Sequence, residues 1–232
     1  MTTTAPKLRP SLRANAPKID IEQALWADGR SAVVGFDEVG KGSWAGPLTV
    51  GAVMIPTDHR LYKIRDSKQL RESEREALFD RVRSWAARWS VGHASAAECD
   101  ALGMSDAQRL ATDRAIAALG TSPDHALVDG KWDFVGRGST TTIVKGDQRS
   151  VSIAAASIIA KVTRDRMMRA NAAEFPWYAF DSNKGYPCHR HRAALRALGP
   201  STIHRRSWAF MDDLPWTGIP ECVEQAEPLR LF

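Results

Sequence analysis

The stretch AVVGFDEVGKG, residues 32–42, decides the fold because it joins an apolar run to two carboxylates and a glycine-rich turn. Residues 32–36 are apolar and include two β-branched side chains, which is typical of a buried strand. Asp37 and Glu38 follow directly, and two glycines then indicate a turn. We therefore expect a buried strand that brings an acidic pair to one edge of a sheet.

Two more apolar segments run into an acid that lies beside glycine. Residues 125–128 precede Asp129-Gly130, and residues 140–144 precede Lys145-Gly146-Asp147. Ligands of open α/β sheets gather at strand ends, so these acids are expected to converge with the first pair. Ordinary turn chemistry is the alternative at any single position, because Asp tolerates turns and Gly supplies positive φ. Repetition at three strand ends favours a shared cation, since crowded like charges are costly without one.

The remaining periodicity predicts an α/β fold with a mixed sheet flanked by helices. Trp85 and Trp89 lie on an apolar stripe and are expected in the core, and Ser105 to Gln108 has the spacing of a capping box. The segment 57–71 is interpreted as a polar loop. We expect helices at 21–27, 72–89, 106–119, 152–174 and 189–198, and further strands at 48–55 and 89–93.

Composition and charge limit the class of protein. The 232 residues are 44% hydrophobic, which is enough for one core, and a net charge of +5 is compatible with a polyanionic partner. The three cysteines are widely spaced and form no CxxC pair, so neither a disulfide framework nor a zinc site is indicated. No run is long and apolar enough for a membrane span or a secretory signal, and we expect a cytoplasmic protein.

The chain is expected to divide into three parts. Residues 1–18, rich in proline and basic side chains, are interpreted as a disordered basic arm. Residues 19–213 would form the catalytic domain, and residues 214–232 a loosely ordered tail.

A basic segment at residues 182–211 contains no Asp or Glu and is a candidate surface for a phosphate backbone. A solvated basic helix face is the alternative. Tyr186 within this segment is a candidate stacking platform for a base or sugar, although it could equally be a core tyrosine. The basic and histidine side chains are Lys184, Arg190, Arg192, Arg196, Arg205, Arg206, His189, His191 and His204.

These motifs together resemble the ribonuclease HII family of bacteria, from about Val33 to Phe210. The segments that carry the resemblance are GFDEVGKGSWAGPL, LVDG, KGDQRSVSIAAASIIAKVTRD, NKGYP and HRRSW, in that order. The resemblance implies a ribonuclease H-like fold: a five-stranded mixed sheet flanked by helices, with a small C-terminal helical part.

The resemblance also implies a function and a set of ligands. The family hydrolyses the RNA strand of RNA–DNA hybrids and cuts 5′ of ribonucleotides embedded in duplex DNA, leaving 3′-hydroxyl and 5′-phosphate ends. Its four acids, matched here by Asp37, Glu38, Asp129 and Asp147, hold two Mg²⁺ or Mn²⁺ ions. Hard cations of this kind prefer oxygen ligands, and two of them suit an in-line phosphodiester hydrolysis.

Substrate recognition carries over to the glycine turn and to NKGYP. Backbone groups at Gly40, Lys41 and Gly42 would approach the ribose 2′-hydroxyl, and Tyr186 would pack on the following deoxyribose. Only glycine allows so close an approach by the backbone, and the 2′-hydroxyl distinguishes RNA from DNA. The commonest form of the motif has Arg where this chain has Lys41. Lys41 therefore leaves open the preference between single ribonucleotides and long hybrids.

Two alternative functions and one possible partner stay open on the sequence alone. A related family, ribonuclease HIII, shares Gly-Lys-Gly but carries an N-terminal domain for which residues 1–31 leave no room. A non-catalytic hybrid-binding protein and a resolvase-like nuclease are the alternative functions. The final PLRLF, residues 228–232, resembles peptides that dock on the bacterial sliding clamp, or it folds back on its own domain. We expect a monomer.

Overall fold

The computed structural model describes residues 16–61 and 63–214, in which five strands form one mixed sheet. The strand order is β3-β2-β1-β4-β5. β2 pairs antiparallel with both β1 and β3, whereas β4 pairs parallel with both β1 and β5. This confirms the expected α/β sheet. The strands are β1 (Val33–Val39), β2 (Leu48–Met54), β3 (Arg88–Ala94), β4 (His125–Asp129) and β5 (Ser139–Ile143).

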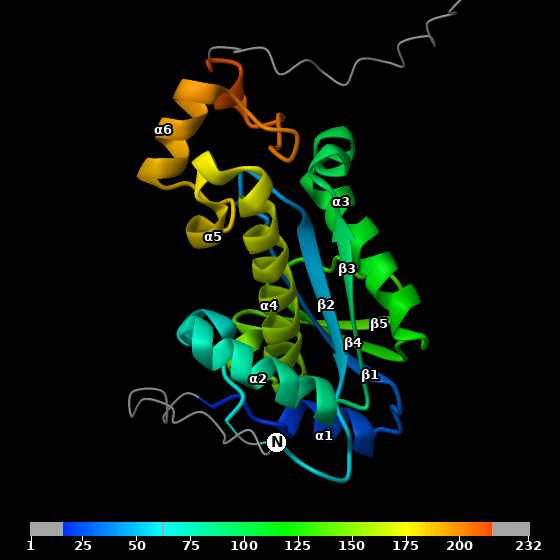
Figure 1. Cartoon of the computed structure of the whole chain (residues 1–232). Helices are drawn as coiled ribbons and strands as arrows, with labels where there is room; N and C mark the ends of the chain where they lie inside the picture. The colour runs from blue at the N-terminus through cyan, green and yellow to red at the C-terminus, as the bar shows by residue number, and fades with distance from the viewer. Residues whose placement is uncertain (1–15, 62, 215–232) are drawn as a thin grey trace, which may run out of the picture.

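Helices cover both faces of the sheet, with α3 on one side and α2 and α4 on the other (Figure 1). α5 and α6 lie beyond one end of the sheet, where they form a small C-terminal part. The helices are α1 (Asp20–Ala27), α2 (Glu72–Trp85), α3 (Ala96–Leu119), α4 (Val151–Glu174), α5 (Phe180–Asn183) and α6 (His189–Leu198). Short 3-10 turns are η2 (Ser67–Gln69), η3 (Gly146–Gln148), η4 (Pro176–Tyr178) and η5 (Ala209–Met211).

Alternate side chains of the central strands point to opposite helices. Val34 and Phe36 of β1 pack in the cluster that contains the apolar face of α3. Gly35, between them, faces α4, where a Cβ would lie only 2.3 Å from the carbonyl carbon of Ser152. The absence of a side chain at Gly35 therefore lets the start of α4 approach β1 closely.

A buried carboxylate from α1 holds the N-terminus of α4. Glu22 is fully buried and accepts hydrogen bonds from the Ser150 hydroxyl at 2.6 Å and the Ser152 N–H at 2.8 Å. A carboxylate at this end of a helix also interacts favourably with the helix dipole. Nearby, the N–H of Lys18 donates to the Arg149 carbonyl oxygen at 3.1 Å, so this last residue of the predicted arm contacts the folded domain.

Three element predictions need correction. The helix predicted to reach Trp89 ends at Trp85, because Trp89 belongs to β3, where it is only partly buried. The helix predicted over residues 106–119 is only the second part of α3, which already begins at Ala96, where Ser95 and Glu98 form the capping box. Gly103 interrupts α3 with a φ of +76°. The predicted loop 57–71 contains η2 and several buried side chains.

Several other predictions fall partly or wholly outside the described residues. Residues 1–15 of the predicted basic arm, the tail beyond residue 214, and Cys222 lie outside the described residues. Cys99 and Cys188 are free thiols. Between residues 16 and 214, leaving out 62, no helix combines the length and apolarity that a bilayer span requires.

Candidate active site

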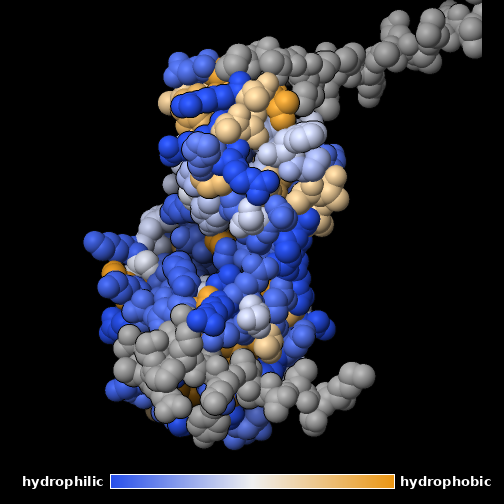
Figure 2. All heavy atoms as spheres, turned by 60° about the vertical axis from the view of Figure 1, so that its left-hand side comes forward, coloured by the Kyte–Doolittle hydropathy of each residue, from blue (hydrophilic) through white to orange (hydrophobic). Residues whose placement is uncertain are grey.

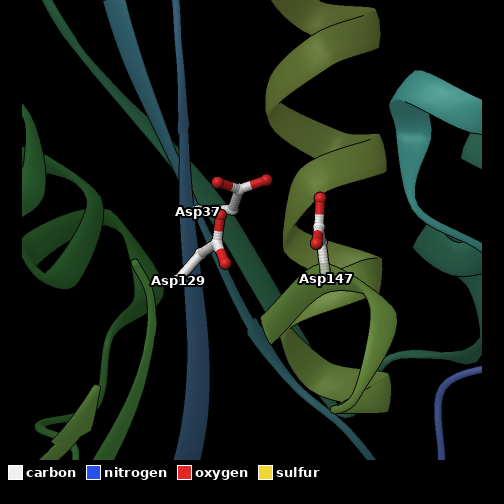
Figure 3. Close-up of side chains that lie close together, drawn as sticks. All are labelled: Asp37, Asp129 and Asp147. Atoms are coloured by element: carbon white, nitrogen blue, oxygen red, sulfur yellow. The ribbon is translucent and has the colours of Figure 1, made fainter. Parts of the chain in front are cut away.

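Three aspartates meet at one edge of the sheet. Oxygen atoms of Asp37, Asp129 and Asp147 lie within 4.8 Å of one another (Figure 3). Asp37 and Asp129 come from β1 and β4, which are parallel neighbours and therefore reach the same edge. Asp147 comes from η3, the turn between β5 and α4. The sequence-based prediction that these three acids converge is confirmed.

Local hydrogen bonds fix the acids. Oδ1 of Asp37 accepts from the N–H of Glu38 at 2.8 Å, and Oδ1 of Asp129 accepts from the N–H of Gly146 at 2.7 Å. A Cβ on Gly146 would lie 2.7 Å from Cδ1 of Ile153, so any other residue here would require the end of the Ile153 side chain to move. One detail differs from the prediction: β1 continues to Val39, so Asp37 and Glu38 lie within the strand rather than after it.

Glu38 stands beside the three aspartates but outside their group. It is partly buried and shares with Asp37 a pocket of about 210 Å³. The pocket is lined by Asp37, Glu38, Val39, Ser67, Lys68, Ser157, Lys161 and Tyr186. It thus joins acidic residues from the sheet to basic residues and to the tyrosine of NKGYP.

Burial and mutual repulsion perturb these carboxyl groups. Burial, followed by the charges of Glu38 and Asp129, raises the pKa of Asp37 well above its ordinary value. Burial, followed by the charge of Asp66, raises the pKa of Asp147 to about 7. Burial also raises the pKa of Glu38, although Lys41 opposes the shift. Such a group of hard oxygen donors, short of positive charge, fits a divalent cation.

Residues of the predicted polar loop also belong to the site, which sequence reasoning missed. Asp66 is 3% exposed, and its Oδ1 accepts from the N–H of Lys68 at 2.7 Å. The Lys68 amine lies 3.6 Å from Oδ2 of Asp147 and is the nearest cation to that acid among the described residues. Ile64 and Leu70, both buried, bracket this turn and were the available sign that it packs inward.

The glycine turn lies next to Tyr186. The N–H of Gly40 donates to the Tyr186 hydroxyl at 3.0 Å. Gly40 has a φ of +91°, and a Cβ there would lie 2.4 Å from Nε of Arg164. At Gly42 a Cβ would meet no atom within 4 Å. Lys41 is exposed, and its amine donates to Oε1 of Gln108 at 3.1 Å.

The basic segment 182–211 splits into an exposed and a buried set. Arg190, Arg192 and Arg196 are exposed on α6. Lys184 is 6% exposed; its amine donates to the Asp181 carbonyl oxygen and lies 3.6 Å from Oε2 of Glu72.

The prediction that segment 182–211 forms a basic surface is wrong at four positions, one of which is Lys184. His191, His204 and Arg205 are at most 2% exposed, because they bind groups of the protein itself. The side of the molecule that lies on the left in Figure 1 is mostly hydrophilic, and it is hollowed between the C-terminal part and the body around α2 (Figure 2).

A mixed five-stranded sheet that gathers carboxylates at the ends of neighbouring strands defines a ribonuclease H-like enzyme. A family model described as ribonuclease HII matches residues 34–211. The chain belongs to the ribonuclease HII family. It is a type 2 ribonuclease H, an endoribonuclease that degrades the RNA of RNA–DNA hybrids.

Known relatives agree in sequence and in structure. A ribonuclease HII from Streptomyces avermitilis is 44% identical over 201 residues, which is 86% of each chain. The ribonuclease H2 of Pyrococcus horikoshii has a TM-score of 0.65 at 26% identity, covering 79% of this chain and 96% of that one. The ribonuclease HII in a complex with PCNA from Archaeoglobus fulgidus has a TM-score of 0.65 at 28% identity, covering 77% and 95%.

Proposed function

We propose that this enzyme cuts 5′ of ribonucleotides embedded in duplex DNA, and also cuts the RNA strand of longer hybrids, leaving 3′-hydroxyl and 5′-phosphate ends. The observation that carries the proposal is the convergence of Asp37, Asp129 and Asp147 within 4.8 Å. Two divalent ions, Mg²⁺ or Mn²⁺, are the proposed cofactors. They would supply activation of a water and stabilisation of the departing oxygen.

The proposed ligands are Asp37, Glu38, Asp129 and Asp147. All four offer hard carboxylate oxygens, and the buried positions of Asp37 and Asp147 keep competing water away. Glu38, outside the group of three, would complete the set from the side of the pocket that it shares with Asp37. The scissile phosphate would reach the carboxylates only through the bound ions, whereas the amine of Lys68, 3.6 Å from Oδ2 of Asp147, would offset part of its negative charge directly.

Recognition of the ribose is assigned to Gly40, Lys41, Gly42 and Tyr186. Gly42 supports this assignment, because no protein atom of the described residues would touch a Cβ there. The free space would be filled by the sugar, so the need for glycine comes from the substrate. Tyr186 lies in the same pocket as the carboxylates, within reach of a neighbouring sugar.

The exposed arginines of α6 are proposed to bind the phosphate backbone, which gives affinity without sequence preference. Lys184 was expected to share this role. Its amine is instead turned toward Asp181 and Glu72, so its proposed contribution is to hold the NKGYP segment that carries Tyr186.

The decisive experiment uses a DNA duplex with one ribonucleotide. With Mg²⁺ or Mn²⁺ we expect a single cut on the 5′ side of the ribonucleotide, mapped on a sequencing gel, and no cut with EDTA. Matched all-DNA duplexes and four-way junctions should stay intact. Cutting without metal would refute the two-metal mechanism, cutting of junctions would favour a resolvase-like nuclease, and binding without cutting a non-catalytic hybrid binder.

Two further proposals concern the oligomeric state and a protein partner. We propose a cytoplasmic monomer whose residues 228–232, PLRLF, dock on a sliding clamp; these residues lie outside the described part of the chain. A complex with PCNA exists for the Archaeoglobus fulgidus relative and supports the idea. Deleting the last five residues should abolish clamp binding in surface plasmon resonance while leaving the cutting rate unchanged. Unchanged clamp binding would refute the proposal.

A further inference from the structure

Two arginines are fully buried beneath the glycine turn. Arg164 of α4 and Arg205 of the HRRSW segment are both 0% exposed. In residues 16–61 and 63–214, neither guanidinium forms an ion pair with a carboxylate. Burial lowers the pKa of Arg164 to about 10, so this group remains charged at neutral pH. Burying a charge is costly, and the groups that these arginines bind must offset that cost.

Arg164 binds backbone groups of the residues that follow the Gly-Lys-Gly turn. Its Nε donates to the Pro47 carbonyl oxygen at 2.8 Å, and Nη2 donates to the Ala45 carbonyl oxygen at 3.0 Å. Nη2 also donates to the Ser43 hydroxyl at 2.8 Å, which in turn donates to the Gly40 carbonyl oxygen at 2.9 Å. A short chain of hydrogen bonds therefore links Arg164 to the first residue of the Gly-Lys-Gly turn.

Arg164 also connects the turn to NKGYP. Its Nη1 donates to the Lys184 carbonyl oxygen at 2.8 Å. Its guanidinium carbon lies 5.4 Å from the centre of the Tyr186 ring. One side chain thus holds both of the segments that are assigned to the sugar.

Arg205 binds a backbone group within the Gly-Lys-Gly turn and another one after it. Its Nη1 donates to the Lys41 carbonyl oxygen at 3.2 Å, and its Nη2 donates to the Gly46 carbonyl oxygen at 3.0 Å. Between them, the two arginines and Ser43 hold carbonyl groups at Gly40, Lys41, Ala45, Gly46 and Pro47.

Because these carbonyl groups are held in place, the geometry of the peptide also fixes the direction of the N–H groups that follow them. In a planar trans peptide, the carbonyl and the following N–H point in opposite directions. When the Gly40 and Lys41 carbonyls point inward to Ser43 and Arg205, the N–H groups of Lys41 and Gly42 must point outward. Within the described part of the chain, nothing accepts a hydrogen bond from either N–H.

We propose that Arg164 and Arg205 are positioning residues, which hold the carbonyls of the glycine turn inward and so present the N–H groups of Lys41 and Gly42 to the ribose 2′-hydroxyl. This inference rests on the proposed function of the turn. A guanidinium suits the task because its donors are fixed in a planar fork, whereas a lysine amine offers one point of charge. Arg205→Lys should therefore keep the charge but lose the paired grip.

The test compares Arg205→Lys with Arg206→Lys, its neighbour, which is more exposed. Binding is measured by fluorescence anisotropy with Ca²⁺, with a gel to verify that the strand stays intact. The ligands are a duplex with one ribonucleotide and the same sequence as all-DNA. The readout is the ratio of the two Kd values. A loss of folded protein weakens both Kd values together and leaves this ratio unchanged.

Arg205→Lys should lower the preference for the ribonucleotide by about tenfold while the Kd for all-DNA stays unchanged. Arg206→Lys should retain the wild-type ratio. Ser43→Ala, a smaller change that cuts the link from Arg164 to Gly40, should lower the ratio in the same direction. An unchanged ratio in folded Arg205→Lys and Ser43→Ala would overturn the inference alone. If the wild-type protein bound both duplexes with the same Kd, the proposed recognition of the ribose would be overturned as well.

Discussion

The carboxylate site and the arginines beneath the glycine turn both place like charges in the interior. The carboxylate site contains three acids, Asp37, Asp129 and Asp147. The amine of Lys68 lies 3.6 Å from Oδ2 of Asp147. Arg164 and Arg205 are buried more deeply, yet every hydrogen bond described above for these guanidinium groups ends on a carbonyl or hydroxyl oxygen.

The difference lies in what the backbone can offer. Carbonyl oxygens are abundant in a turn and satisfy several guanidinium donors at once, so the arginines need no ligand from outside. Three carboxylates that share one small space cannot all be satisfied by N–H groups, and burial together with the remaining repulsion raises the pKa of Asp37 and of Asp147. We therefore interpret the arginine region as a scaffold and the carboxylate region as the proposed binding site for the ions.

The largest expected effect is the loss of turnover in Asp37→Asn. Removing one ligand should lower kcat by about 10³-fold or more, because the ions lose their position. Without metal, the same change should raise Tm by a few degrees, because it removes a buried like charge. Binding of uncut duplex should persist. Asp106→Asn, an exposed acid on α3, is the matched control; equal effects from both changes would contradict the comparison.

Substitutions in the glycine turn, which lies between the carboxylates and the buried arginines, should change either activity or stability, depending on the position. Gly42→Ala meets no protein atom and should leave Tm unchanged while lowering kcat/KM by about 10²-fold, because the methyl group occupies the space of the sugar. Gly40→Ala requires strained backbone and collides with Arg164, so it should lower Tm by several degrees. Thermal melts and single-ribonucleotide cleavage measure both. A full rate for Gly42→Ala would remove the assigned contact.

The two ends of the molecule should respond to pH in opposite directions. Asp37 and Asp147 have a raised pKa in the folded state, so the folded protein binds more protons and metal-free stability falls as pH rises from about 4 through 7. Buried in the C-terminal part, His204 has its pKa lowered to about 3, chiefly by burial. There the unfolded chain binds more protons, and stability falls as pH drops from about 6.5 toward 3.

Melting curves between pH 4 and pH 8 measure the sum of the two slopes, each of which approaches about 1.4 kcal/mol per pH unit per proton, and added Mg²⁺ and the histidine variants distinguish the two contributions. Mg²⁺ should raise Tm more at pH 8 than at pH 5, because protons compete with the cation for the carboxylates. His204→Gln should lessen the loss of stability on the acidic side, relative to wild type, whereas His189→Gln, exposed on α6, should not. A metal effect independent of pH would count against the carboxylate site.

The smallest effect is expected at the exposed arginines. Arg196→Gln should weaken binding of duplex by about two- to threefold and reduce the slope of log K against log salt by about 1. Arg30→Gln, in the segment after α1 at the far end of the sheet, should change neither quantity. Equal slopes for Arg196→Gln and wild type would place the phosphate contacts elsewhere.

The sequence predicted most of the fold and the three converging aspartates, because strand periodicity and Asp-Gly turns are local signals. It predicted the part of α3 after the kink at Gly103 but missed the part before it, where Ser95 and Glu98 form the capping box. It also missed Asp66 and Lys68. Their contacts with the region of Asp147 cross about eighty residues of sequence, and no local pattern encodes such a contact.

By itself, the amino-acid sequence determined which acids lie at strand ends, which glycines permit tight turns, and which family the motifs resemble. Tertiary structure alone decided which basic residues are buried. Arg205 and Arg206 are neighbours of identical chemistry, yet Arg205 is enclosed by the carbonyls of the Gly40–Pro47 turn, whereas Arg206 is not fully buried. The physical reason is that burial of a charge depends on partners brought together in space, and the chain only acquires these partners when it folds.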